Sequence, residues 1–123
     1  MSKKRRQIRY MIVKDGIIEV RYTDDFIMMM EEEYHWFFDT TDNLFKRFPD
    51  IRVFVRDNSL CFNDKTEIHY HYDDDRDMDF KGTVYFAKLR ERSVVSLSKK
   101  EISFLMKNLK RREDNTFEIS YDS

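Results

Sequence analysis

The sequence predicts an α+β fold in which an antiparallel sheet of about six or seven strands carries helices packed on one face. Three observations support this class: apolar and polar side chains alternate on both sides of Asp15-Gly16, apolar spacing turns helical after Ser98, and alternation returns over 117–121. Alternation is typical of strands, and a repeat of three to four residues is typical of helices. The expected order of elements is ββ-α-ββββ-α-β.

The first two strands are expected to form a hairpin. Their alternating apolar side chains are Ile8, Tyr10 and Ile12 before the Asp15-Gly16 pair and Ile18, Val20 and Tyr22 after it. An Asp-Gly pair between two alternating runs favours a two-residue turn.

Two helices are predicted in the next segment. Thr23, Asp24 and Asp25 offer capping oxygens before a helix that places Phe26, Met29, Met30 and Phe37 on one side. A second cap at 40–42 predicts a short helix that buries Leu44, Phe45 and Phe48 and ends at Pro49.

The middle of the chain reads as strands at 51–56, 60–62, 67–72 and 83–89, with 94–97 extending the sheet. We expect 73–79 to be an exposed acidic loop because like charges repel one another. Ser98 and Glu101 match a capping box before the spaced apolar residues Ile102, Leu105, Met106 and Leu109. A helix over Lys99 to Arg112 and a closing strand are therefore expected.

Composition narrows the class of protein. A chain of 123 residues predicts one domain over 1–123, with residues 1–6 as a flexible basic arm. Only 2 Gly and 1 Cys are present, which argues against glycine-rich phosphate loops, internal disulfides and zinc sites built on paired cysteines. No apolar run approaches the length of a membrane span, so we expect no membrane partner. With a single Cys and no signal-peptide pattern, a reducing cytosol is the expected compartment, and we expect no cofactor.

The net charge of -1 hides a block pattern. Residues 24–45 include seven acids and no Lys or Arg, whereas 80–112 hold ten basic and two acidic residues. Either the blocks neutralise one another in the folded chain, or they form separate basic and acidic surfaces.

The predicted last helix supplies the basic candidates, which are Lys99, Lys100, Lys107, Lys110 and Arg111. Cations gathered on one helix face are suited to the phosphates of nucleic acid or to an acidic partner. The alternative is a solvated helix face whose cations favour the C-terminal end. The acidic candidates for a basic partner are Asp73, Asp74, Asp75, Asp77, Glu31 and Glu32, with solvated charge as the alternative.

Histidines offer a metal-binding hypothesis. His69 and His71 share one face of a strand, and Asp73 or Asp75 follows closely, so these side chains are candidate zinc ligands. The alternative, which we favour, is a solvent-facing strand that buries Ile68, Tyr70 and Tyr72 on its other side.

The leading hypothesis is a small non-catalytic intracellular binding protein. It would engage nucleic acid, or inhibit a protein that handles nucleic acid, as a phage or mobile-element inhibitor does. One alternative is a metal-dependent hydrolase that uses His69, His71 and an Asp of 73–75. Another is a homo-oligomeric structural subunit that associates through an exposed Met28 to Met30 segment.

Overall fold

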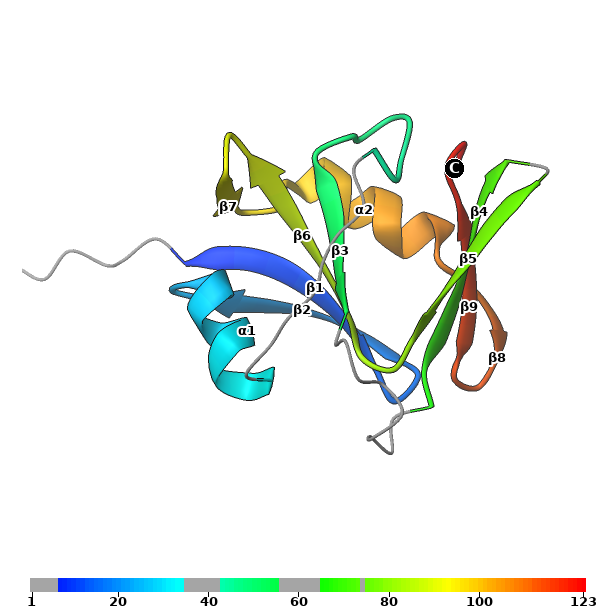
Figure 1. Cartoon of the computed structure of the whole chain (residues 1–123), viewed down its shortest axis with the longest axis horizontal. Coiled ribbons are helices and arrows are strands. Elements are labelled where there is room, and N and C mark those ends of the chain that lie inside the picture. Colours follow the sequence, from blue (N-terminus) through cyan, green and yellow to red (C-terminus); the bar gives the residue numbers. More distant parts are fainter. Residues whose placement is uncertain (1–6, 35–42, 56–64, 74) are drawn as a thin grey trace, which may run out of the picture.

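The protein has a mixed α+β fold, seen in a computed structural model that describes residues 7–34, 43–55, 65–73 and 75–123 (Figure 1). The helices are α1 (Phe26–Tyr34) and α2 (Lys99–Asn108). The strands are β1 (Ile8–Lys14), β2 (Ile17–Thr23), β3 (Ile51–Val55), β4 (Glu67–Asp73), β5 (Arg76–Lys81), β6 (Val84–Arg90), β7 (Ser93–Val95), β8 (Lys110–Glu113) and β9 (Thr116–Ser120).

These strands form two sheets. The first sheet has five strands, in the order β2-β1-β6-β3 with β7 paired to β6, and the second has four in the order β5-β4-β9-β8. The α+β class is therefore confirmed. The expected single antiparallel sheet of six or seven strands is wrong, because the chain crosses between two sheets and because β4 and β9 pair in parallel.

The hairpin expected around Asp15-Gly16 is confirmed. Lys14 and Ile17 are the last paired residues of β1 and β2, and they enclose the two turn residues. Asp15 has φ 52° and Gly16 has φ 75°, as a type I′ turn requires.

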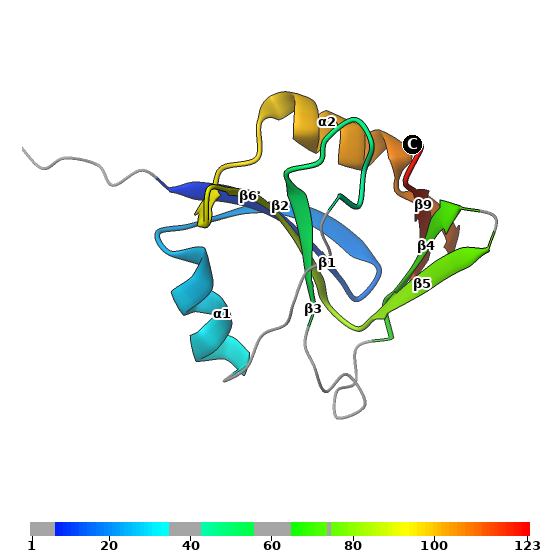
Figure 2. The same cartoon turned by 45° about the horizontal axis from the view of Figure 1, so that its top comes forward.

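The first sheet is covered on both faces. One face packs against α1, and its cluster includes Tyr10, Ile12, Tyr85 and Ala87. The other faces α2 and the second sheet, and its cluster includes Met11, Val13, Val84 and Phe86. The helices thus lie on opposite faces of this sheet, and the expectation of one helical face is wrong (Figure 2). The unbroken apolar runs Tyr10–Val13 and Val84–Ala87 indicate burial on both faces, since strands covered on both sides lose the alternation of apolar and polar residues.

Phe45 joins the three layers of the main core. Its ring centroid lies 6.1 Å from that of Tyr70 in the second sheet, 6.3 Å from that of Phe86 in the first sheet and 5.3 Å from that of Phe104 in α2. Leu44 and Phe45 are buried as predicted, whereas Phe48 is only half-buried, and the short helix expected here does not form over 43–48. The buried Tyr70 hydroxyl donates instead to the Leu44 carbonyl, and burial raises the pKa of Tyr70.

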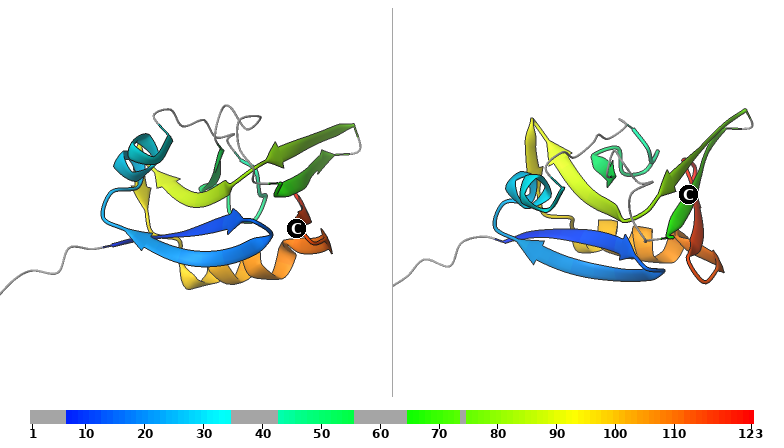
Figure 3. Two further views of the ribbon diagram at one scale, coloured as in Figure 1. Left: turned by 90° about the horizontal axis from the view of Figure 1, so that it is seen from below. Right: turned by 60° about the horizontal axis from the view of Figure 1, so that its bottom comes forward.

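Both glycines of the chain lie where the two sheets meet. The Gly16 amide donates to Thr66 Oγ1 at 3.0 Å, and the Gly82 amide donates to the Thr66 carbonyl at 2.7 Å. Gly82 has φ 83°, a conformation that favours glycine, and the chain bends there from β5 into β6 (Figure 3). The turn at Lys81-Gly82 is therefore the corner between the sheets.

α1 begins where the sequence predicts. Asp25 caps it, since the Met28 amide donates to Asp25 Oδ1 at 3.1 Å. Met30 is fully buried and only Met28, 55% exposed, is largely open to solvent, so the exposed Met28 to Met30 segment assumed for the homo-oligomer is wrong. The residues expected to form the basic arm (1–6), the apolar contact at Phe37 and the return strand at 60–62 lie outside the described ranges.

α2 is shorter than expected. Its capping box at Ser98 and Glu101 is confirmed, but the helix ends at Asn108 and residues 110–113 form β8 rather than more helix. Similarly, the described residues of 73–79 are exposed as expected, but the loop is wrong because Asp73 ends β4 and 76–79 belong to β5. In both places pairing with a neighbouring strand outweighs the local preference of charged residues. Neither α1 nor α2, the helices of the described ranges, is long and apolar enough to cross a bilayer.

Candidate anion-binding groove and the charged face of the second sheet

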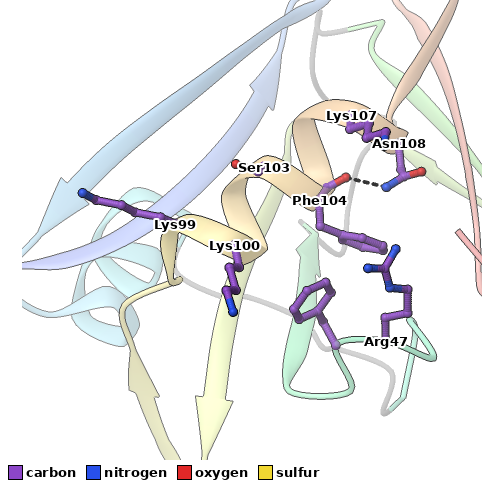
Figure 4. Close-up of a pocket in the computed structure, with 8 residues that line it drawn as sticks. Arg47, Lys99, Lys100, Ser103, Phe104, Lys107 and Asn108 are labelled. Atoms are coloured by element: carbon purple, nitrogen blue, oxygen red, sulfur yellow. Dashed lines mark hydrogen bonds between the residues drawn. The ribbon is translucent and has the colours of Figure 1, made fainter.

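A groove of about 370 Å³ lies between α2 and the segment that precedes β3 (Figure 4). Most of its lining comes from one flank of the helix. The residues that line it are Arg47, Phe48, Lys99, Lys100, Ser103, Phe104, Lys107 and Asn108. We refer to this feature as the α2 groove.

Aromatic rings make the apolar part of the α2 groove. The ring centroids of Phe48 and Phe104 are 4.8 Å apart, and the guanidinium carbon of Arg47 lies 6.0 Å from each of them. The Asn108 side-chain amide donates to the Phe104 carbonyl at 2.8 Å. Phe104 is buried and Phe48 is half-buried, so the rings hold Arg47 beside α2 and leave its charge at the groove.

The cations of the α2 groove have no carboxylate partner within the part of the chain that the structure describes. Lys99, Lys100 and Lys107 are all exposed. The only acid in α2, Glu101, is 3% exposed and accepts from Lys88 Nζ at 3.1 Å and from the Ser98 amide at 2.8 Å. The helix therefore neutralises a cation of β6 beneath it and leaves its own lysines free for a partner.

Two of the five basic candidates lie elsewhere. Lys110 stands on β8 and lines a separate pocket with His71 and Glu118. Arg111 Nη2 donates to the Gly16 carbonyl at 2.6 Å, and its guanidinium carbon lies 4.7 Å from the Phe117 ring centroid. Arg111 therefore links the β1–β2 hairpin to the second sheet through a hydrogen bond.

The structure adds Arg47, which sequence reasoning missed as a site residue. Its signal was its place beside Lys46 in a basic segment immediately before Phe48 and Pro49. The sequence predicted a short helix around Arg47 but gave no sign that this segment packs against the last helix, because no local pattern encodes that contact.

The acidic candidates do not gather on one surface. Asp73, Asp75 and Asp77 lie on the β4–β5 hairpin, whereas Glu31 lies on α1 at the other end of the molecule (Figures 1 and 3). Asp73 accepts from Arg76 at 2.9 Å (Nε) and 2.6 Å (Nη2), and this arginine lowers the pKa of Asp73. Asp74 and the side chain of Glu32 fall outside the described part of the chain.

β4 separates its side chains cleanly. Ile68 and Tyr70 are fully buried in the core, and Glu67, His69 and His71 lie on the outer face of the second sheet, as the favoured interpretation predicts. Tyr72, which was also expected to be buried, is only half-buried against the core. Asp73, the expected third metal ligand, is paired with Arg76 instead. The carboxylates beside the histidines come from β5 and β9.

The two histidines have different surroundings. His69 Nδ1 lies 2.6 Å from Asp79 Oδ1. His71 is held from both sides, with Nδ1 2.9 Å from Asp77 Oδ1 and Nε2 2.6 Å from Glu118 Oε1. The hydrogen bond to Asp77, and then that to Glu118, raise the pKa of His71.

Comparison of the chain with protein-family models, with curated proteins and with solved structures finds no match.

Proposed function

We propose that this protein is a non-catalytic binding protein whose α2 groove engages the phosphate backbone of nucleic acid. The observation that carries the proposal is that Arg47, Lys99, Lys100 and Lys107 all line one groove. None of the four forms an ion pair with a carboxylate in the described ranges. Phosphate contacts by Lys and Arg give affinity that does not depend on sequence.

The position of the lysines strengthens this inference. Lys99 and Lys100 lie in the first turn of α2, where the helix dipole is positive and cations are unfavourable. A solvated helix face would keep its cations near the C-terminal end, and of the three lysines only Lys107 is there. An anion at the groove would offset this local repulsion.

Part of the groove is suited to the nucleotide as well as to the phosphate. Phe48 is half-buried at the groove, with the Arg47 guanidinium beside it. Partly exposed aromatic rings next to cations favour single strands, whose bases are free to stack. We therefore expect single-stranded nucleic acid to bind more tightly than a duplex.

The test is a charge reversal with a matched control. The groove triple is Lys99→Glu, Lys100→Glu and Lys107→Glu. The control triple is Lys14→Glu, Lys65→Glu and Lys81→Glu, which changes the net charge equally at exposed lysines outside the groove. Binding of a labelled single-stranded oligonucleotide would be measured by fluorescence anisotropy over a series of salt concentrations.

We expect the groove triple to lose binding at low salt and the control triple to retain it. For the unmodified chain, log Kobs should fall linearly with log salt, with a slope of about -0.7 for each phosphate contact. Equal losses in both triples would show that only net charge matters. Unchanged binding by the groove triple would exclude the groove as the nucleic-acid site and leave an acidic protein surface as its partner.

A further inference from the structure

Three possible metal ligands converge on the outer face of the second sheet. His69 Nδ1 lies 2.6 Å from Asp79 Oδ1 and 3.9 Å from Glu67 Oε1. One donor atom from each of the three residues lies within 4.8 Å of the other two. None of these residues lines the α2 groove.

The sheet fixes the positions of these ligands. Glu67 and His69 are two residues apart on β4 and therefore share a face, and Asp79 stands opposite His69 in the β4–β5 ladder. β4 is an inner strand, hydrogen-bonded to β5 on one side and to β9 on the other. A site on paired strands is held more accurately than one on a loop.

His71 shows what a site unsuited to metal looks like on the same strand. Its two carboxylate neighbours contact different ring nitrogens, so Asp77 and Glu118 lie on opposite sides of the imidazole. A single ion cannot contact all three groups. Arg112 Nε also lies 3.1 Å from Glu118 Oε2 and would repel a cation.

The surroundings of His69 differ from those of His71 both in where the carboxylates lie and in the pairing of those carboxylates with a cation. Both carboxylates approach the same nitrogen, Nδ1. Lys81, which stands opposite Glu67 in the ladder, forms no ion pair with it in the described ranges. The side chains of Glu67, His69 and Asp79 are 30%, 38% and 46% exposed, so an ion can enter from solvent.

The donor spacing is close to that of a metal centre. In a tetrahedral zinc site, ligand distances of about 2.0–2.2 Å place neighbouring donor atoms roughly 3.4 Å apart. The observed distances of 2.6 Å and 3.9 Å bracket this value. Metal binding needs the His69–Asp79 hydrogen bond to open and Glu67 to move inward, with Nδ1 free of its proton.

We propose that Glu67, His69 and Asp79 bind one divalent transition-metal ion of the zinc type. One imidazole and two carboxylates suit Zn²⁺ better than Ca²⁺ or Mg²⁺, which prefer ligand sets made of oxygen alone. Three protein ligands leave the fourth position to water or to a group from a partner.

The experiment uses the full chain after removal of metal with a chelator. Zn²⁺ is titrated in competition with a chromophoric chelator, and Mg²⁺ is titrated separately. The variants are Asp79→Asn and its matched control Asp77→Asn, because both carboxylates lie on β5 and both hydrogen-bond to a histidine of β4.

We expect one Zn²⁺ per chain, weakened at least about tenfold by Asp79→Asn and within about twofold of normal in Asp77→Asn. Absence of saturable Zn²⁺ binding, or equal losses in the two variants, would overturn the assignment. If Asp79→Asn does not fold, imidazole nitrogen spectra of the unmodified chain decide. Zn²⁺ should shift the Nδ1 resonance of His69, and a shift at another histidine instead would refute the site.

Discussion

The α2 groove and the outer face of the second sheet both carry several charged side chains, but only those of the sheet face around His71 are paired with one another. On the sheet face, His71 is paired with Asp77 and Glu118, and Glu118 is also paired with Arg112. In the groove, Lys99, Lys100 and Lys107 have no such partners in the described ranges. The groove is therefore distinguished from the face around His71 by cations that the described part of the fold leaves without carboxylate partners.

This contrast continues within α2. Glu101 and Lys107 belong to the same helix, but Glu101 is turned inward against Lys88, whose side chain is only 15% exposed. A buried ion pair that loses one member leaves the other charge desolvated and unmatched. A solvated lysine leaves nothing behind when it is removed.

The largest effect is therefore expected for Glu101→Ala. This substitution should lower the free energy of unfolding by about 3 kcal/mol, because it leaves the largely buried Lys88 charge without a partner and removes half of the capping box. Lys107→Ala should change it by less than about 0.5 kcal/mol. Urea unfolding followed by circular dichroism measures both.

Replacing the pair together, as Lys88→Met with Glu101→Leu, should recover most of the loss. Similar values for Glu101→Ala and Lys107→Ala would mean that the pair is solvated.

A smaller effect is expected at Arg111, which the sequence analysis placed among the binding cations of the last helix. Arg111→Ala should cost about 2 kcal/mol of stability, because the guanidinium donates to the Gly16 carbonyl and stacks on Phe117. Arg111→Lys should restore little, since lysine lacks the planar fork. Lys110→Ala, next to it on β8, serves as the control and should be nearly neutral. A neutral Arg111→Ala in thermal unfolding would contradict the structural role.

The sequence was informative wherever a local pattern decides the structure. The Asp15-Gly16 turn, the Asp25 cap and the Ser98–Glu101 capping box each follow from a few adjacent residues. The β4 alternation also predicted which side chains face outward.

The sequence-based predictions that were wrong or incomplete concern features that depend on contacts between distant segments. Residues 110–113 have good helix formers, and only their pairing with β9 makes them a strand. Arg47 reaches the groove because Phe48 packs on Phe104, a contact that no short motif encodes. The partners of the histidines likewise come from the register of β5 and β9, which spacing along β4 does not reveal.

The smallest effect concerns Asp73, an acidic candidate that the fold pairs within its own hairpin. Its hydrogen bonds from Arg76 favour the ionised carboxylate, so the pKa of Asp73 lies below its ordinary value in the folded chain. Whatever stability this pair supplies is present above the ordinary carboxyl pKa and is lost as pH falls through the lowered one.

Arg76→Ala should raise the pKa of Asp73 toward the ordinary value, whereas Arg90→Ala, which removes a pairing with Asp50 instead, should leave the pKa of Asp73 unchanged. Carboxyl carbon shifts followed by NMR through an acid titration measure this. An Asp73 pKa that stays low without Arg76 would assign the effect to the backbone amide of Asp75, which also donates to this carboxylate at 2.9 Å.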